Sequence, residues 1–352
     1  MSKSSEMITE DSVREKLGEV NYPGFSRDIV SFGLVKEVLV DGSDVTVKIS
    51  LATRDPNVPR QIHEGTEAAL SALEGVGKVS VDFDIQDPPE PVTGGDPAAG
   101  QSSIPGVKKI IAVGSGKGGV GKSTVATNLA IALSKTGAKV GLCDCDLYGP
   151  SVALMLGAGD KQPMATEQNE IIPIEAHGIK AISMGFLLSE DSPVIVRGPL
   201  ATRYTQQFLR QCLWGELDYL VLDLPPGTGD IQLTIVQTVA VDAAVIVTTP
   251  QEVALIDARK AIGMFAKVNV PIAGIVENMA WFECDRGKKY FIFGEGGGAK
   301  EAEERGLPLL AEIPLDVPTR DRADSGQPVA LEDPADNAIS GAFANLAEKL
   351  SS

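Results

Sequence analysis

One glycine-rich segment holds the residues best suited to chemistry: Gly116, Lys117, Gly118, Gly119, Val120, Gly121, Lys122, Ser123 and Thr124. Their spacing fits the pattern G-x-x-x-x-G-K-[ST], in which backbone N–H groups surround phosphate oxygens. A β-rich run at 110–113 precedes the segment and a helical pattern at 125–133 follows, so the loop leads into a helix N-terminus, where anions bind. The sequence therefore predicts a nucleoside triphosphate site, with the Lys122 ammonium on the β- and γ-phosphates and the Ser123 hydroxyl on Mg²⁺.

A second lysine, Lys117, stands where this pattern allows any residue. Since Lys122 already serves the phosphates of its own loop, we expect Lys117 to reach a nucleotide held by a second copy of the chain. A solvated loop lysine is the alternative. No arginine that would stabilise the transferred phosphoryl group is recognisable, so Lys117 from the partner is the best candidate for part of that role, and we expect slow hydrolysis.

Acidic residues follow two of the predicted strands. Asp144 and Asp146 end the run VGLCDCD, and we favour Asp146 as the residue that polarises the attacking water, with a structural role for Asp144. Asp223, in LVLDLPPGTGD, is the expected second Mg²⁺ anchor. The turn after it would let the N–H of Gly227 sense the γ-phosphate, which would make the site an ATP-dependent switch. An ordinary surface turn is the alternative.

The composition excludes several classes of protein. With 352 residues, 43% of them apolar and 22% charged, the chain is typical of a globular protein with room for two domains. Its net charge is −17 and both halves are acidic, which argues against a nucleic-acid partner. No apolar run approaches the roughly 20 residues of a membrane span. The polar N-terminus is unlike a signal peptide, and the 4 cysteines make no disulfide framework, so we expect a cytoplasmic protein.

The elements that must position these residues fall into three segments. Residues 7–86 contain a helical stripe, two strands around Asp41-Gly42, a second helical stripe and an alternating strand, which predicts a small α+β domain. Residues 87–106 are rich in proline and glycine, as flexible linkers are. Residues 107–352 alternate strand and helix. This order predicts an α/β P-loop NTPase fold, with a mostly parallel sheet flanked by helices.

Five strands are predicted in the large segment, at 110–113, 139–143, 219–223, 244–248 and 272–276. They are rich in Val, Ile and Leu without alternation, as strands buried on both faces are. Ligands of such sheets bind beyond the carboxyl ends of the strands, where the motifs above fall. A C-terminal apolar stripe, from Ile339 to Leu350, predicts a packing helix. A membrane anchor is the alternative, but Lys349 is its only basic residue.

Six motifs carry a resemblance to a known family: GKGGVGKST, CDCDLYGPS, VRGPL, DLPPGTGDIQLT, TTPQEVAL and VENM, in that order. Over residues 107–350 the chain resembles the Mrp/ApbC iron–sulfur cluster carriers, of the deviant Walker A branch that includes MinD, ParA and nitrogenase iron protein. The N-terminal segment resembles the MIP18-like domain often fused to this family. The resemblance implies an ATP-binding homodimer with Mg²⁺, a [4Fe–4S] cluster, and apo iron–sulfur proteins as recipients.

The resemblance also assigns roles to residues of the nucleotide site. Lys117 is similar to the signature lysine that contacts nucleotide across the homodimer. Asp146 resembles the switch I aspartate, and Asp223 with Gly227 resembles the switch II region. Catalysis would then depend on Lys117, Lys122, Asp146 and Asp223.

Three further residues are implied to contact the base. Asn278 matches the residue that reads adenine, which suits the paired donor and acceptor of an amide. Pro314 and Asp316 lie in the segment IPLD, which resembles the loop that packs against the base. Arg197, in VRGPL, is a family feature whose role does not follow from the sequence.

The chain departs from the family at the cluster ligands. The family has a C-x-x-C pair after VENM, so that two protomers supply four thiolates to one cluster. Here Cys284 occupies the first position and Gly287 the second, and a dimer offers two thiolates. The neighbouring Asp285 is a hard oxygen ligand that suits a cluster poorly. The other cysteines, Cys143, Cys145 and Cys212, are expected to be buried packing residues.

Three hypotheses follow for the function. We favour an ATPase that couples hydrolysis to the transfer of an iron–sulfur cluster, with no membrane and no nucleic acid as partner. The second hypothesis is an ATP-switched spatial regulator like MinD or ParA, which would need a membrane or DNA surface. The third is a regulatory ATPase that has lost its cluster, which Gly287 makes plausible.

Overall fold

The structure is a computed structural model that describes residues 8–23, 28–53, 57–73, 75–86, 102–187 and 198–351. These residues form two compact units, and each is described by itself. Residues 87–101 of the predicted linker lie outside the described residues, and so does Arg197.

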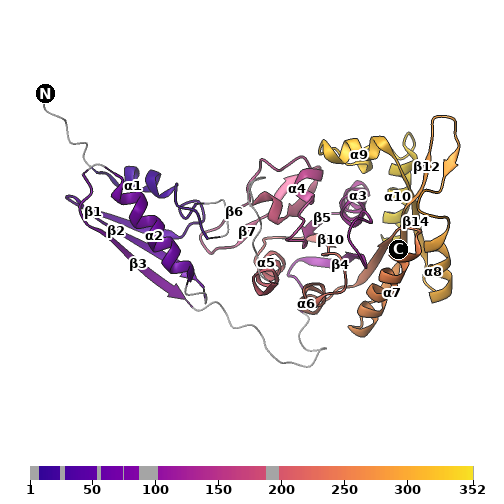
Figure 1. Ribbon diagram of the computed structural model, residues 1–352, viewed down its shortest axis with the longest axis horizontal. Coiled ribbons are helices and arrows are strands. Elements are labelled where there is room, and N and C mark those ends of the chain that lie inside the picture. The colour runs from indigo at the N-terminus through magenta and orange to yellow at the C-terminus, as the bar shows by residue number, and fades with distance from the viewer. Residues whose placement is uncertain are drawn as a thin grey trace. The chain divides into compact units, whose positions relative to one another are not determined.

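The N-terminal unit contains α1 (Glu10–Leu17), β1 (Val35–Asp41), β2 (Asp44–Ala52), α2 (Asn57–Ser71) and β3 (Val79–Gln86), in the predicted order. Its sheet has the order β1-β2-β3, with β1 antiparallel and β3 parallel to β2. Helices α1 and α2 cover one face of this sheet (Figure 1). Val13, Leu17, Ile62 and Leu70 from the two helices are fully buried, which gives the unit a hydrophobic core of its own.

The main elements of the C-terminal unit are β4 (Val107–Gly114), α3 (Lys122–Lys135), β5 (Val140–Asp144), α4 (Val152–Met155), β8 (Ile174–Ala176), β9 (Ile179–Ile182), α5 (Gly198–Arg210), β10 (Leu217–Asp223), α6 (Asp230–Thr238), β11 (Ala243–Thr248), α7 (Glu252–Lys267), β12 (Ile272–Glu283), β13 (Lys289–Tyr290), α8 (Gly297–Arg305), β14 (Leu309–Leu315), α9 (Val317–Asp324) and α10 (Ala338–Ser351). Shorter elements are β6 (Met164–Ala165), β7 (Ile171–Ile172) and the 3₁₀ turns at Met184–Phe186 and Val329–Leu331. Within the described residues, one nine-stranded sheet has the order β13-β12-β11-β4-β10-β5-β9-β8, and β14 pairs with β12. Its strands are parallel except for β8 and β13, which confirms the predicted fold class.

Helices cover both faces of this sheet (Figure 1). On one face α3 packs against the central strands, and α10 packs on α3 and β14. On the other face Phe265 of α7 and Gln232 of α6 lie against Gly114 at the end of β4. Helix α10 buries its whole apolar stripe, including Phe343 and Leu346, and the Lys349 ammonium donates to the Leu310 carbonyl at 2.6 Å. The prediction of a packing helix is therefore confirmed.

Strand β12 is longer than predicted, because it continues from Ile272 to Glu283. Strand β14, which follows it in the chain after β13 and α8, pairs with it as far as Phe282. The register shifts between Asn278 and Phe282, and Met279 has a left-handed backbone (φ 56°). The sequence after residue 276 contains no local signal for this extension, because its pairing partner, β14, is remote in the sequence.

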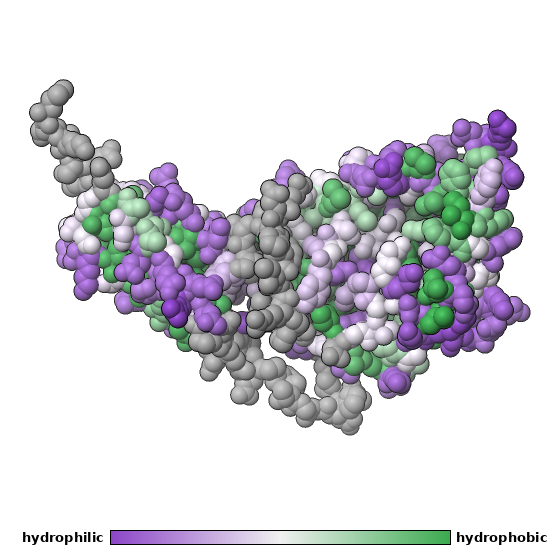
Figure 2. Space-filling view, viewed as in Figure 1, coloured by the Kyte–Doolittle hydropathy of each residue, from purple (hydrophilic) through white to green (hydrophobic). Residues whose placement is uncertain are grey.

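The surface of the C-terminal unit is mostly hydrophilic on the face drawn in Figure 2, with separate hydrophobic patches. Large apolar side chains stay exposed at the end of β13 and just beyond it, at Tyr290, Phe291 and Ile292. Among the described residues, no helix combines the length and the apolar character required to cross a membrane.

Candidate nucleotide site and the Cys284 hairpin

The parallel register brings the predicted motifs to one edge of the sheet. Asp223, the last residue of β10, pairs with Val113 of β4 on one side and with Asp144 of β5 on the other. The phosphate loop follows β4 directly, so the acidic residues after β5 and β10 meet it at the carboxyl ends of the strands.

The phosphate loop leads into α3 without a side-chain cap. Gly121, the N-cap of α3, has a left-handed backbone (φ 81°) and, as a glycine, gives the first turn no side-chain cap. Such a helix N-terminus carries partial positive charge and binds anions. Gly116 is required for a different reason: a Cβ atom there would lie 2.0 Å from the Asp257 carbonyl of α7, so the loop packs on the helix backbone.

Lys122 and Asp223 form a buried ion pair inside the loop. The Lys122 Nζ lies 2.5 Å from Asp223 Oδ1 and 3.2 Å from the Ser123 hydroxyl, and the two charged side chains are 6% and 0% exposed. Asp223 Oδ2 is buried and has no hydrogen-bond partner in the described part of the chain. A carboxylate oxygen beside a hydroxyl is a ligand set that Mg²⁺ accepts. Ser123 and Asp223 therefore fit the predicted metal.

Asp144 and Asp146 have different surroundings. Asp144 is 1% exposed and accepts hydrogen bonds from the Ser183 hydroxyl (2.8 Å) and from backbone N–H groups, that of Val152 among them (3.2 Å). Burial, and then the nearby Asp223, raise the pKa of Asp144 to about 7. Asp146 is half-exposed, and its Oδ1 accepts from the N–H of Gly149. Asp144 thus holds the loop that carries Asp146.

Ser183 was not predicted as part of the site. It follows β9, a strand next to β5, and no local pattern in the sequence marks it as the partner of Asp144.

Lys117 and Gly227 both lie near Ser115. Lys117 is half-buried, and its ammonium has no ion pair or hydrogen bond among the described residues. Its carbonyl accepts from the Ser115 hydroxyl at 3.0 Å. The N–H of Gly227, which was expected to face the γ-phosphate, donates instead to the Ser115 carbonyl at 3.0 Å. In this conformation the turn after Asp223, which we call the switch loop, is hydrogen-bonded to the start of the phosphate loop.

Of the three residues expected at the base, Asn278 contacts the phosphate loop. Its Nδ2 donates to the Val120 carbonyl at 2.9 Å, and the side chain is 7% exposed. Pro314 lies within β14, and Asp316 is the N-cap of α9, accepting from the N–H of Thr319 at 2.9 Å. The carboxylate of Asp316 is thus occupied in capping a helix.

Cys284 lies in the turn between β12 and β13. Its N–H donates to the Lys288 carbonyl (3.1 Å) and its carbonyl accepts from the N–H of Gly287 (2.8 Å), with Gly287 in the left-handed region (φ 72°). The Cys284 side chain is partly exposed. Among the described residues no group of three or more His, Cys, Asp or Glu side chains is placed to hold a metal ion.

The other cysteines are buried, as predicted. The sulfur atoms of Cys143 and Cys145 lie 3.7 Å apart inside the protein, and Cys212 is 8% exposed. Burial raises the pKa of Cys143 and Cys212, which keeps these thiols protonated and disfavours ligand chemistry. Cys212 follows the C-terminal end of α5.

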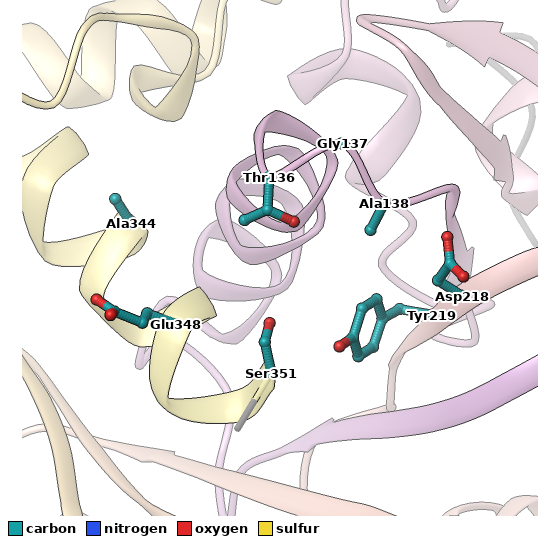
Figure 3. Close-up of a pocket in the computed structure, with 8 residues that line it drawn as sticks. All are labelled: Thr136, Gly137, Ala138, Asp218, Tyr219, Ala344, Glu348 and Ser351. Atoms are coloured by element: carbon teal, nitrogen blue, oxygen red, sulfur yellow. The ribbon is translucent and has the colours of Figure 1, made fainter.

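A hollow of about 610 Å³ lies at the far end of α3 (Figure 3). It is lined by Thr136, Gly137, Ala138, Asp218, Tyr219, Ala344, Glu348 and Ser351. Because Asp218 and Tyr219 are near the start of β10, this hollow lies at the amino-terminal edge of the strands. It is separate from the phosphate loop.

Comparison with known families decides the relationship. The sequence model described as NUBPL iron-transfer P-loop NTPase matches residues 106–351. The chain belongs to this family of iron-transfer P-loop NTPases. A second model, described as iron-sulfur cluster assembly protein, matches residues 10–81. Both matches confirm the resemblance drawn from the six motifs and from the N-terminal unit.

Curated relatives of this chain are similar to it over most of their length. The iron-sulfur cluster carrier protein of Deinococcus radiodurans is 48% identical over 92% of this chain and 90% of its own. That of Haemophilus influenzae is 43% identical over 97% and 91%. Among solved structures, a nucleotide-binding protein from Archaeoglobus fulgidus in complex with ADP is 39% identical, with a TM-score of 0.57, over 64% of this chain and 90% of that one. The cell division ATPase MinD of Pyrococcus furiosus is 25% identical, with a TM-score of 0.55, over 69% and 98%.

Proposed function

We propose that this chain is an ATP-dependent carrier of iron–sulfur clusters that works as a cytoplasmic homodimer and delivers its cargo to apo proteins. The buried pair of Lys122 and Asp223 at the open N-terminus of α3 is the observation that carries the nucleotide part. The names of the relatives, iron-sulfur cluster carrier proteins, support the choice of cargo. We propose further that residues 7–86, 87–106 and 107–352 act as assembly domain, linker and ATPase domain.

The binding step uses the residues of the phosphate loop. The triphosphate draws the Lys122 ammonium from Asp223 to its own oxygens, where N–H groups from Gly116 to Thr124 also donate. Asp223 and Ser123 then hold Mg²⁺, which screens the negative charge of the phosphates when bound. We propose that Asn278, Pro314 and Asp316 line the adenine side of the site.

The hydrolytic step needs a positioned water and a second positive charge. Asp146 can accept a hydrogen bond from the attacking water, because its carboxylate is partly exposed while Asp144 holds its loop. The ammonium of Lys117, which has no partner among the described residues, stabilises the charge that develops in the pocket of the partner protomer. When a γ-phosphate is bound, the N–H of Gly227 would leave the Ser115 carbonyl. This change would pass the presence of the γ-phosphate to the rest of the switch loop, the turn after Asp223.

The cluster is cargo, and its proposed ligand is Cys284. One protomer supplies one partly exposed thiol, so two copies must close together to bind a [4Fe–4S] cluster through two thiolates. A cluster held by two protein thiolates leaves iron positions open to the thiolates of a recipient. Incomplete ligation therefore suits transfer better than storage.

A second candidate function rests on Gly287. Since the position of the second family cysteine holds glycine, the chain is also consistent with a regulatory ATPase that carries no cluster. A spatial regulator is the less favoured alternative, because α10 is packed into the core and its one basic side chain, Lys349, is bonded to β14. We therefore propose neither a membrane nor a nucleic-acid partner.

One experiment separates the carrier from the regulator. The protein is reconstituted anaerobically with iron and sulfide, with and without a non-hydrolysable ATP analogue, and iron, sulfide and mass are measured per particle. A carrier gives a dimer with visible charge-transfer absorption that Cys284→Ala removes. Absorption that persists in Cys284→Ala, or no absorption in the wild type, rejects this cargo site.

A further inference from the structure

A buried amide in the first turn of α6 has no role in the function proposed above. Gln232 is 1% exposed, and neither its Nε2 nor its Oε1 has a hydrogen-bond partner among the residues that the structure describes. Buried polar side chains almost always have partners, since an unsatisfied amide destabilises the conformation that contains it. Gln232 is therefore placed for a hydrogen bond that this conformation does not make.

The amide lies at the start of the phosphate loop. A Cβ atom on Gly114, the last residue of β4, would be 3.2 Å from Gln232 Nε2. The loop before α6 contacts the next residue, because the N–H of Gly227 donates to the Ser115 carbonyl. The residue after that, Gly116, packs on the backbone of α7. The segment just before Lys117 is thus held from one side by α6 and its loop, and from another by α7.

A second unsatisfied group lies at the end of the neighbouring strand. Strand β11 pairs with β4, with Ile246 opposite Gly114, and Thr249 directly follows this strand. Thr249 is 1% exposed, and its hydroxyl has no partner in the described ranges. Two buried groups with unused hydrogen-bonding capacity therefore belong to elements next to the first half of the phosphate loop. The presence of two such groups favours a second conformation of the first half of the phosphate loop.

We propose that Gln232 is a positioning residue of the ATPase site. In the triphosphate-bound state its amide bonds to the backbone at Gly114–Lys117, and this bond fixes the direction in which Lys117 leaves the loop. Gln232 lies on α6, directly after the switch loop. Its hydrogen bond to the phosphate loop therefore forms together with the rearrangement that releases Gly227 from Ser115. This inference rests on the proposed ATPase function, and it adds Gln232 as the residue that links α6 to Lys117.

The test compares two nucleotides in one variant. Gln232→Met keeps the length and apolar bulk of the side chain and removes both amide groups. We expect its affinity for a non-hydrolysable ATP analogue to fall about tenfold, as the loss of one net hydrogen bond implies, while its affinity for ADP stays unchanged. Thr66→Val, in the N-terminal unit, removes another buried hydroxyl without a described partner and serves as the matched control, with no effect on either affinity.

A second measurement uses the wild-type protein and so does not depend on how the variant folds. Amide hydrogen exchange of the peptides that contain Gly114–Lys117 and Asp230–Thr234 is recorded with ADP and with the analogue. Greater protection of both peptides with the analogue supports the proposal. Equal protection with the two nucleotides, or equal loss of both affinities in Gln232→Met, overturns it. If wild-type protein binds no ATP analogue, the proposed function itself has failed.

Discussion

The Lys122 ammonium lies 2.5 Å from a carboxylate oxygen of Asp223, 101 residues away in the sequence, and both groups are buried. Each group is the other's ion-pair partner, and each is also a predicted ligand of the bound nucleotide and its metal. The ammonium therefore lies where a triphosphate could replace the carboxylate as its partner.

This pairing predicts a coupled effect on folding. Lys122→Met and Asp223→Asn each leave one buried charge without its partner, and each should lower the free energy of unfolding by about 3–5 kcal/mol. The double variant should lose less than the sum of the two, because it buries no unpaired charge. Chemical denaturation of the nucleotide-free protein measures all three, and additive losses would show that the pair is not coupled. None of the variants should bind ATP as the wild type does.

The proposed exchange of lysines between protomers predicts complementation. Lys117→Ala should lower the turnover of ATP by about 10³-fold, the lower end of what a charge supplied in trans contributes, while it leaves much of the ATP affinity. Lys122→Ala should weaken binding itself. When the two inactive chains are mixed, a dimer contains one pocket with its own Lys122 and the partner's Lys117, so turnover should return. A mixture without activity would mean that Lys117 acts within its own chain. Lys300→Ala, at an exposed lysine of α8, is the control.

The environment of Asp144 predicts a pH-dependent stability difference. Its pKa is raised from 3.8 to about 7 by burial and by Asp223, so the folded protein binds a proton here more tightly than the unfolded chain does. The contribution of this carboxyl to stability is therefore largest below pH 4 and falls as the pH rises towards 7. Asp144→Asn lacks this titration, so the unfolding free energy of the wild type minus that of the variant should fall as the pH rises over that range. The measurement is denaturation of the protein free of nucleotide and Mg²⁺, and a difference that rises with pH would contradict the assignment.

The hairpin at Cys284 predicts a gain of function. Gly287→Cys restores the second thiol of the family pattern, and a Cβ atom at this position meets no atom closer than 3.9 Å. The left-handed backbone there (φ 72°) should cost about 1–2 kcal/mol of stability. We expect more iron and sulfide to remain bound per dimer after reconstitution, and slower transfer to an apo ferredoxin-type acceptor. Gly294→Cys, another exposed left-handed glycine, should change neither quantity.

The sequence alone determined the kind of fold and the place of the phosphate loop. The phosphate loop is contiguous in the chain, and the alternation of buried strands with helices is a local pattern, so both follow from neighbouring residues. The α+β order of the N-terminal unit and the buried stripe of α10 were predictable for the same reason. The missing second cysteine could also be read directly from the sequence.

Only the tertiary structure decided how distant segments meet. Glycine is required at position 116 because a Cβ atom there would collide with the Asp257 carbonyl of α7. Asn278 donates to the Val120 carbonyl, 158 residues away. The amide of Gln232, which has no hydrogen-bond partner in the described part of the chain, likewise has meaning only beside Gly114. Which strands become neighbours is set by the packing of the whole sheet, and hydrogen bonds between remote residues depend on that order. A local pattern therefore names the residues of the loop, while the sheet determines what each of them touches.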